Sequence, residues 1–220
     1  MKQFPTLELE NAHFAETGSP LIAGLDEAGR GALAGPVVAA AVILPLENEA
    51  ALAALTAVND SKLLTPKRRD NLFDLIIKHA LCYGIGSASA AVIDQIGIIA
   101  ATKQAMKTAV SQLKPAPTFL LIDGRIRLTS LLTPQQAIIR GDAKSRSIAA
   151  ASILAKVTRD RHMVALHPQH PVYRFDQHKG YGTAVHRAAI AQHGATAVHR
   201  HTFAPMQNQH SLFRKAFSEK

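Results

Sequence analysis

The feature that most constrains the fold of this chain is an alternation of short apolar runs with longer helical segments. The runs Leu21–Leu25, Pro36–Leu44 and Thr118–Ile122 are short and apolar, which is typical of buried strands. Further strands are expected at 81–87 and 136–140, and helices at 65–79, 90–114 with a break near Gly97, 143–162 and 183–193. This order of elements predicts an α/β fold, in which helices cover a central sheet.

The length of 220 residues suffices for one hydrophobic core and is too short for two full-sized domains. We expect an N-terminal extension at 1–18, polar and flexible or loosely packed, and a single domain with a helical C-terminal part at 19–220. The one cysteine, Cys82, cannot form a disulfide within the chain. The longest apolar run, Ala32–Pro45, is too short for a membrane span, so we expect a cytoplasmic protein without a membrane partner. We also expect a monomer.

The net charge of +9 comes from the last third of the chain. From Met1 to Ile139, 12 Lys and Arg residues balance 12 Asp and Glu residues, whereas 13 basic and four acidic residues lie between Arg140 and Lys220. The same region holds nine of the 11 histidines. Such a region favours a polyanionic partner, because phosphate contacts release counterions. A basic surface that only keeps the protein soluble would have the same composition.

Acidic residues follow directly on two of the expected strands. Asp26-Glu27 ends the first run before a glycine-rich segment, and Asp123-Gly124 ends the third. Because successive side chains of a strand face opposite ways, Asp26 and Glu27 can both reach one metal ion only where the strand ends or bends. Alternatively, a backbone carbonyl is the second ligand. Each acidic segment by itself is more typical of a turn than of a metal site.

A further acid, Asp142, precedes the strongest helix of the chain, and capping of that helix would explain it without any chemistry. Taken together, Asp26, Glu27, Asp123 and Asp142 offer the oxygen ligands that hard divalent cations prefer. Two such ions about 3.5–4 Å apart can activate a water and stabilise the leaving oxygen in phosphodiester hydrolysis. The sequence has neither the Cys/His spacing of a zinc site nor a Walker-type loop.

The strongest helix carries two stripes of different chemistry. Its apolar stripe, at Ala150, Ile153, Leu154 and Val157, predicts a side that faces the core. The other stripe contains small and basic residues, and it either binds the phosphates of a nucleic acid or lies partly exposed as an ordinary amphipathic surface. It consists of Ser145, Ala149, Ser152, Lys156 and Arg159.

Six segments, in order, resemble the type 2 ribonucleases H, and their spacing resembles that of bacterial ribonuclease HII. They are Asp26–Gly31 (DEAGRG), Asp60–Leu64 (DSKLL), Ile122–Gly124 (IDG), Gly141-Asp142 with the helix Ile148–Asp160, His178–Thr183 (HKGYGT), and His193-Gly194 with Arg200–Phe203. Together they span about Leu21 to Pro205. One departure is Ala32, which stands where the family commonly has proline.

The resemblance implies an RNase H-like fold, with a central mixed sheet flanked by helices and a helical C-terminal segment. It implies an endonuclease that hydrolyses the RNA strand of RNA–DNA hybrids with Mg²⁺ or Mn²⁺, leaving a 3′-hydroxyl and a 5′-phosphate. It also implies nicking of ribonucleotide-containing duplex DNA on the 5′ side of embedded ribonucleotides, the step that starts ribonucleotide excision repair.

The resemblance also implies roles for individual residues. The acids that bind metal and act in catalysis would be Asp26, Glu27, Asp123 and Asp142. The residues that recognise the RNA–DNA junction would be Gly29, Arg30 and Gly31, which read the ribose 2′-hydroxyl, and Tyr181, which stacks on the next deoxyribose. The residues that hold backbone phosphates would be Lys62, Ser152 and Lys156. Asp160 is expected to pair with Arg159 or Arg161 and to bind no metal.

Two alternatives stay open at this point. One is another nuclease of the same fold, a type 3 ribonuclease H, which the Gly-Arg-Gly segment and Tyr181 disfavour. The other is a non-catalytic basic nucleic-acid-binding protein. The set of four acids argues against it, because acids in a phosphate groove repel the ligand unless a metal ion neutralises them.

Overall fold

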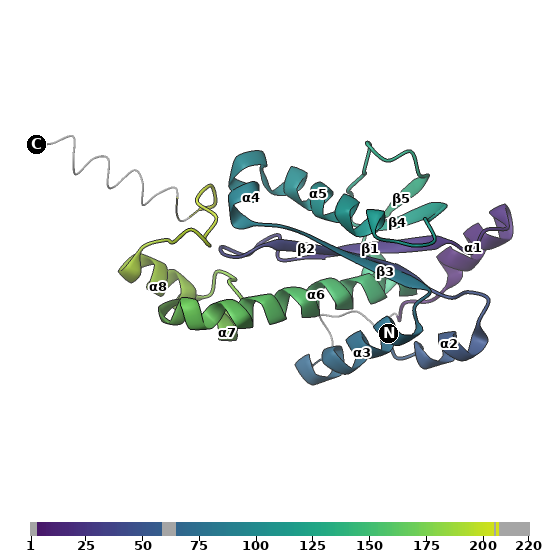
Figure 1. Ribbon diagram of the computed structural model, residues 1–220, viewed down its shortest axis with the longest axis horizontal. Coiled ribbons are helices and arrows are strands. Elements are labelled where there is room, and N and C mark those ends of the chain that lie inside the picture. The colour runs from purple at the N-terminus through teal and green to yellow at the C-terminus, as the bar shows by residue number, and fades with distance from the viewer. Residues whose placement is uncertain (1–3, 59–64, 205, 207–220) are drawn as a thin grey trace, which may run out of the picture.

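The computed structural model describes residues 4–58, 65–204 and 206, and its centre is a five-stranded mixed sheet (Figure 1). The strands are β1 (Ile22–Ala28), β2 (Val37–Ile43), β3 (Cys82–Ala88), β4 (Phe119–Asp123) and β5 (Gln135–Ile138), in the spatial order β3-β2-β1-β4-β5. β1 pairs antiparallel with β2 and parallel with β4. The expected mixed sheet is confirmed, but β1 continues through Asp26 and Glu27, whereas the predicted strand ends at Leu25.

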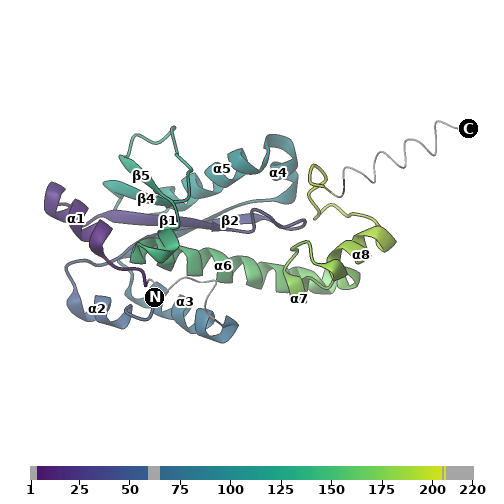
Figure 2. The same cartoon turned by 180° about the vertical axis from the view of Figure 1, so that it is seen from behind.

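Helices cover both faces of this sheet (Figures 1 and 2). One face carries α4 (Ala90–Ile96) and α5 (Ile98–Ser111), and the other carries α3 (Pro66–His79) and α6 (Arg146–Leu166). The remaining helices are α1 (Glu8–Thr17), α2 (Glu49–Ala54), α7 (Phe175–His178) and α8 (Ala184–His193). The last two form the expected helical C-terminal part, at the opposite end of the molecule from α1 (Figure 1). Within the described ranges, every helix is too short or too polar to cross a membrane.

Local sequence signals set several of these boundaries. The Thr65 side chain accepts a hydrogen bond from the Arg68 amide at 3.3 Å, and Pro66 occupies the first turn of α3. Gly97, with φ of +79°, separates α4 from α5 at the predicted break. Thr183 caps α8 through the His186 amide. The predicted starts of α3 and α8 and the predicted break near Gly97 are confirmed, because each depends on neighbours in the sequence.

The N-terminal segment differs from the expectation. Residues 8–17 form α1, so the prediction of a flexible or loosely packed lead-in is wrong for them. Leu9 and Phe14 of α1 pack against a core cluster that contains Ile22, Leu121 and Ile148. The sequence did not predict this helix because its few apolar residues make no clear amphipathic pattern. The packing of Leu9 and Phe14 against the core stabilises it instead.

The helix α6 is buried around most of its circumference. In its small and basic stripe, Ser145, Ala149 and Arg159 are fully buried and Ser152 is 4% exposed, so the interpretation as a partly exposed surface is wrong for these four residues. Small side chains let the helix approach the sheet closely. A Cβ added at Gly24 of β1 would lie only 2.2 Å from the Ser147 carbonyl carbon.

Histidines form part of the core of the C-terminal region. His186 and His199 are fully buried beside the rings of Tyr173 and Phe175. The Thr196 amide donates to Nδ1 of His199, and the Nε2 atoms of the two histidines are 3.2 Å apart. His199 Nε2–H therefore donates to His186, whose Nδ1–H donates to the Tyr181 carbonyl at 3.0 Å. This arrangement needs both rings neutral.

Burial lowers the pKa of both His186 and His199 from about 6.5 to about 4. As pH falls from 6.5 towards 4, the unfolded chain gains protons that the folded state does not, so these rings reduce the free energy of unfolding over that window. We expect the melting temperature of His199→Gln to depend less steeply on pH than that of the wild type. His79→Gln, outside the cluster, is the control and should keep the wild-type slope. Equal slopes for wild type and His199→Gln would contradict the prediction.

Candidate active site

Asp26 and Asp123 lie next to each other on adjacent strands. The parallel register pairs Leu25 of β1 with Ile122 of β4, so Asp26 and Asp123 follow at the next position of each strand. Leu25 and Ile122 belong to the core on the α5 side. Because side chains alternate along a strand, both acids face the α6 side.

Glu27 lies apart from this pair. Its partner in the sheet is Ala39, which packs on the α5 side, whereas Asp26 pairs with Ala40 on the α6 side. Its Oε1 accepts a hydrogen bond from Arg30 Nη1 at 3.0 Å. Since β1 runs on through both acids, their side chains do not converge at a strand end. The alternative of a backbone carbonyl as the second ligand stays a prediction.

Asp142 belongs to a tight turn that lies against Asp123 and Ile148. It is 4% exposed and lies in the 3-10 turn Gly141–Ala143, just before α6. The cap of α6 is Ser145, whose Oγ accepts from the Ile148 amide at 3.2 Å, so the capping explanation for Asp142 is wrong. The Gly141 amide donates to Oδ1 of Asp123 at 2.6 Å. This bond joins the turn of Asp142 directly to Asp123.

Asp26 has the environment that least favours an ionised carboxylate. Its burial, followed by the charges of Glu27 and Asp123, raises the pKa of Asp26 well above its usual range. Two hydrogen bonds act in the opposite direction: the Ser152 hydroxyl donates to Asp26, and the Glu27 amide donates to its Oδ1 at 2.7 Å. A cation bound among these acids would relieve their repulsion.

The chemistry of these donors fits a hard divalent cation. Asp26 and Asp123 present carboxylate oxygens on the α6 side, with Asp142 in the turn that is bonded to Asp123, and Mg²⁺ and Mn²⁺ prefer oxygens of this kind as ligands. Within residues 4–58, 65–204 and 206, no group of three or more His, Cys, Asp or Glu side chains is arranged so that it could hold a metal ion by itself. Mg²⁺ does not need such a group, because it is usually held by one or two carboxylates together with water and substrate phosphate.

The Gly29–Gly31 segment follows β1 and lies close to Tyr181. Ala32 forms an isolated β-bridge with Tyr181, and the Leu33 amide donates to the Gly180 carbonyl at 2.8 Å. A Cβ added at Gly31 would meet nothing within 4 Å, so this part of the backbone borders open space. The fold therefore brings together the two segments that were expected to recognise an RNA–DNA junction.

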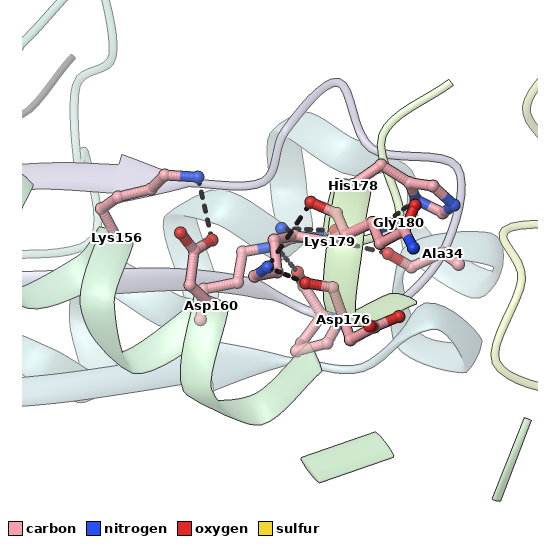
Figure 3. A network of polar contacts seen from close by, with 10 residues as sticks. Ala34, Lys156, Asp160, Asp176, His178, Lys179 and Gly180 are labelled. Carbon is pink, nitrogen blue, oxygen red and sulfur yellow. Dashed lines mark hydrogen bonds and ion pairs between the residues drawn. The ribbon is translucent and has the colours of Figure 1, made fainter. Parts of the chain in front are cut away.

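Lys156 extends from α6 towards Asp160 and Tyr181. Its Nζ is 2.8 Å from Oδ1 of Asp160 (Figure 3) and 5.3 Å from the centre of the Tyr181 ring. The expected pairing of Asp160 with Arg159 or Arg161 is therefore wrong. Lys156, one helical turn before Asp160, is its partner, since side chains at i and i+4 of a helix lie on the same face.

The other two expected phosphate contacts have different outcomes. Ser152 is nearly buried and donates to Asp26, which makes it a neighbour of the acids, and a contact with phosphate stays a prediction. Lys62 lies outside the described residues, as do Asp60 and Ser61.

A cavity of about 650 Å³ opens beside Tyr181, between α3, α6 and the segment 177–181. Its lining contains the basic residues Arg69, Lys156, Arg161 and Lys179. Of these four residues, the sequence predicted a phosphate contact only for Lys156. Arg69 and Arg161 were missed because no local pattern shows that α3 and α6 lie side by side. Lys179 belongs to the HKGYGT segment and could have been named from it; its Nζ donates to the Asp176 carbonyl (Figure 3).

Arg159 joins three backbone positions around this site. Its guanidinium donates to the carbonyls of Pro36 at 2.9 Å, Ala34 at 3.0 Å and Lys179 at 2.9 Å. The side chain is fully buried, and a Cβ added at Gly29 would overlap it at 1.9 Å. The phosphate-binding interpretation of Arg159 is therefore wrong: its donors are used inside the protein.

Arg200 has a similar role beneath the Gly29–Gly31 segment. It is fully buried and donates to the carbonyls of Gly35 at 2.9 Å and Arg30 at 2.9 Å. Burial, followed by the charge of Arg159, lowers the pKa of Arg200 to about 9. The two buried guanidinium groups place positive charge below this segment, which favours the approach of an anionic ligand.

The chain is similar to known ribonucleases over most of its length. The family Ribonuclease HII matches residues 23–206. The Ribonuclease HII of Paraburkholderia xenovorans is 51% identical over 195 residues, which cover 89% of this chain and 77% of that relative. The Ribonuclease HII of Delftia acidovorans is 49% identical over 215 residues, covering 98% and 89%. The crystal structure of the ribonuclease H2 from Pyrococcus horikoshii has a TM-score of 0.73 at 26% identity, and the match covers 88% of this chain and 99% of that one. The RNase H-like fold expected from the sequence is confirmed.

The hydrogen bonds of Arg159 predict a large loss of stability on its removal. Arg159→Ala leaves three buried carbonyls without their donors, and we expect the free energy of unfolding to fall by about 3 kcal/mol or more. Arg159→Lys should recover little of it, because an ammonium cannot replace the planar fork. Arg161→Ala removes the partly exposed ion pair with Asp70 and should cost less than about 1 kcal/mol. Urea denaturation measures all three, and similar values for Arg159→Ala and Arg161→Ala would refute the assignment.

Proposed function

The chain belongs to the ribonuclease HII family, and we propose that it nicks duplex DNA on the 5′ side of embedded ribonucleotides by two-metal-ion catalysis. Family membership makes it an endoribonuclease that cleaves the RNA strand of RNA–DNA hybrids, so the alternative of a non-catalytic binding protein is wrong. The observation that carries the finer proposal is the placement of Asp26 beside Asp123 on one side of the sheet, with the turn of Asp142 hydrogen-bonded to Asp123.

In this proposal, Asp26, Asp123 and Asp142 hold Mg²⁺ or Mn²⁺, and Glu27 contributes a further metal ligand from the next position of β1. When bound, two such ions would activate a water and stabilise the leaving oxygen, so that the products are a 3′-hydroxyl and a 5′-phosphate. The protein orients the acids beforehand. Ser152 and the Glu27 amide orient Asp26, and the Gly141 amide orients Asp123.

Recognition of the ribonucleotide is assigned to the Gly29–Gly31 segment and Tyr181. The open space beside Gly31 admits a ribose close to the backbone, whose amides and carbonyls can bind the 2′-hydroxyl as donor and acceptor. The bridge between Ala32 and Tyr181 keeps the backbone of Tyr181 next to this segment. A flat ring at this position can stack on the deoxyribose that follows the junction.

The nucleic acid backbone is assigned to the basic cavity beside Tyr181. Lys156 would bind phosphate there, and Ser152 and Lys62 complete the proposed contacts. Arg69, Arg161 and Lys179 add positive charge to the same lining, in which Asp70 and Asp160 are the acidic residues. The proposal further holds that the enzyme acts as a cytoplasmic monomer on RNA–DNA hybrids and ribonucleotide-containing duplex DNA.

The acid assignment predicts that Asp123→Asn abolishes cleavage. We expect the rate on a duplex carrying one ribonucleotide to fall by about two orders of magnitude or more, because the amide keeps the size of the side chain but not the charge that binds metal. The dissociation constant for the duplex should change little. The matched control is Asp74→Asn, on the exposed side of α3, which should cleave like the wild type. Normal turnover by Asp123→Asn in Mg²⁺ and in Mn²⁺ would overturn the assignment.

The junction assignment predicts a change of preference in Tyr181→Ala. We expect this variant to lose its preference for a single embedded ribonucleotide over a continuous RNA–DNA hybrid, whereas Tyr181→Phe keeps the ring and the preference. The ratio of kcat/KM on the two substrates measures it. Tyr83→Ala, at a partly exposed tyrosine on the edge strand β3, is the control. An unchanged ratio in Tyr181→Ala would refute the role of the ring.

A further inference from the structure

The N-terminal segment is bonded to the turn that carries Asp142. Thr6 pairs with Ser145 as in a parallel sheet: its amide donates to the Lys144 carbonyl at 3.1 Å, and its carbonyl accepts from the Arg146 amide at 2.9 Å. The two bonds lie on either side of Ser145, the residue that caps α6. A segment far away in the sequence therefore holds the start of α6.

Glu10 of α1 makes a second and stronger connection. Its Oε1 accepts three hydrogen bonds, from Ser145 Oγ at 2.6 Å, Ser147 Oγ at 2.6 Å and the Ser147 amide at 2.9 Å. Glu10 is 1% exposed, and both serines are fully buried. A buried carboxyl group is costly unless hydrogen bonds compensate it, so the observed geometry strongly restrains all three residues.

The hydroxyl of Ser145 links Glu10 to the first turn of α6. Ser145 Oγ donates to Glu10 and accepts from the Ile148 amide at 3.2 Å. Glu10 thereby orients the group that begins α6, and a negative charge at this end is favourable to the helix dipole.

The turn of Asp142 lies between this cluster and Asp123. The amides of Lys144 and Ser145 donate to the Gly141 carbonyl at 2.9 and 2.8 Å, and the Gly141 amide donates to Asp123 at 2.6 Å. Gly141 is therefore bonded to Asp123 of β4 through its amide and, through its carbonyl, to Ser145, which Glu10 holds. A displacement of Ser145 would move Asp142 relative to Asp123.

We infer that Glu10 is a positioning residue for Asp142: through Ser145 and Ser147, it sets the place of the Asp142 carboxylate relative to Asp123. The inference rests on the proposed function, because it takes Asp142 as a metal-binding acid. It assigns the N-terminal segment to the scaffold of the active site. Loss of Glu10 should act on metal binding and turnover and leave the affinity for nucleic acid nearly unchanged.

The test compares Glu10→Ala with Glu10→Gln. The glutamine keeps an oxygen that can accept from both serines, and its amide nitrogen replaces Oε2, which has no hydrogen-bond partner among the described residues. We expect Glu10→Ala to raise the Mn²⁺ concentration at half-saturation about tenfold, as for loss of an outer-shell partner, with kcat reduced and KM within about twofold. Glu10→Gln should restore Mn²⁺ binding to within about twofold of the wild type.

Mn²⁺ binding is followed by electron paramagnetic resonance without substrate, and amide hydrogen exchange at Lys144 and Ser145 reports on the turn. Exchange should accelerate in Glu10→Ala and not in Glu10→Gln. Glu8→Ala, at an exposed residue of α1, is the matched control. Leu9→Ala weakens the packing of α1 without removing the carboxyl group, and it should lower the melting temperature while leaving Mn²⁺ binding unchanged.

Wild-type Mn²⁺ binding and exchange in Glu10→Ala would overturn the inference. An equal loss of Mn²⁺ binding in Leu9→Ala would also overturn it, since general loosening would then be the cause. If Glu10→Ala does not fold, Ser147→Ala, which removes one of the three donors, is judged by the same two readouts. Asp142→Asn separates the inference from the proposed function: wild-type Mn²⁺ binding and cleavage in that variant would refute the role of Asp142 itself.

Discussion

The close packing of α6 against β1 is the contact on which the rest of the site depends. At Gly24 the helix backbone approaches so near that a Cβ would lie 2.2 Å from the Ser147 carbonyl carbon. The alanines Ala149, Ala150 and Ala151 continue the fully buried surface of the helix. Only small residues permit this distance, and α6 thereby brings the turn of Asp142 against Asp123 at the end of β4.

Such close packing buries polar groups, and the molecule compensates each of them in a specific way. Ser152 donates to Asp26, whereas Ser145 and Ser147 donate to Glu10. Arg159 donates to three backbone carbonyls. A fully hydrogen-bonded polar network restrains its members to one arrangement, because every alternative leaves a buried group without a partner. The acids and the junction segment therefore belong to one rigid framework.

The framework places opposite charges close together. Asp26, with neighbouring Glu27 and Asp123, makes a region where carboxylates repel one another, while Arg159 and Arg200 lie buried beneath the Gly29–Gly31 segment. The first region favours cations and the second favours anions. A phosphodiester with its bound metal ions matches this division, since it presents negative oxygens and divalent charge within a few ångströms.

Sequence patterns predicted the strands and most helix boundaries, because each depends on neighbours in the chain. Thr65 with Pro66 starts α3, and Gly97 separates α4 from α5. The sequence pointed to Asp142 as the cap of α6, but a 3-10 turn follows Arg140 and the cap is Ser145. The position of α1 was not predictable, since its stability comes from contacts with β1, β4 and α6.

Asp26-Glu27 shows which properties the sequence determines and which only the tertiary structure decides. The sequence alone determined that two acids follow a buried strand and that glycines come next, and the resemblance assigned them to metal and to the 2′-hydroxyl. Only the tertiary structure decided that Asp26 faces Asp123 and α6, and that Glu27 turns to Arg30. The reason is that β1 continues through both residues, so the alternation of the strand and its register with β4 separate the side chains.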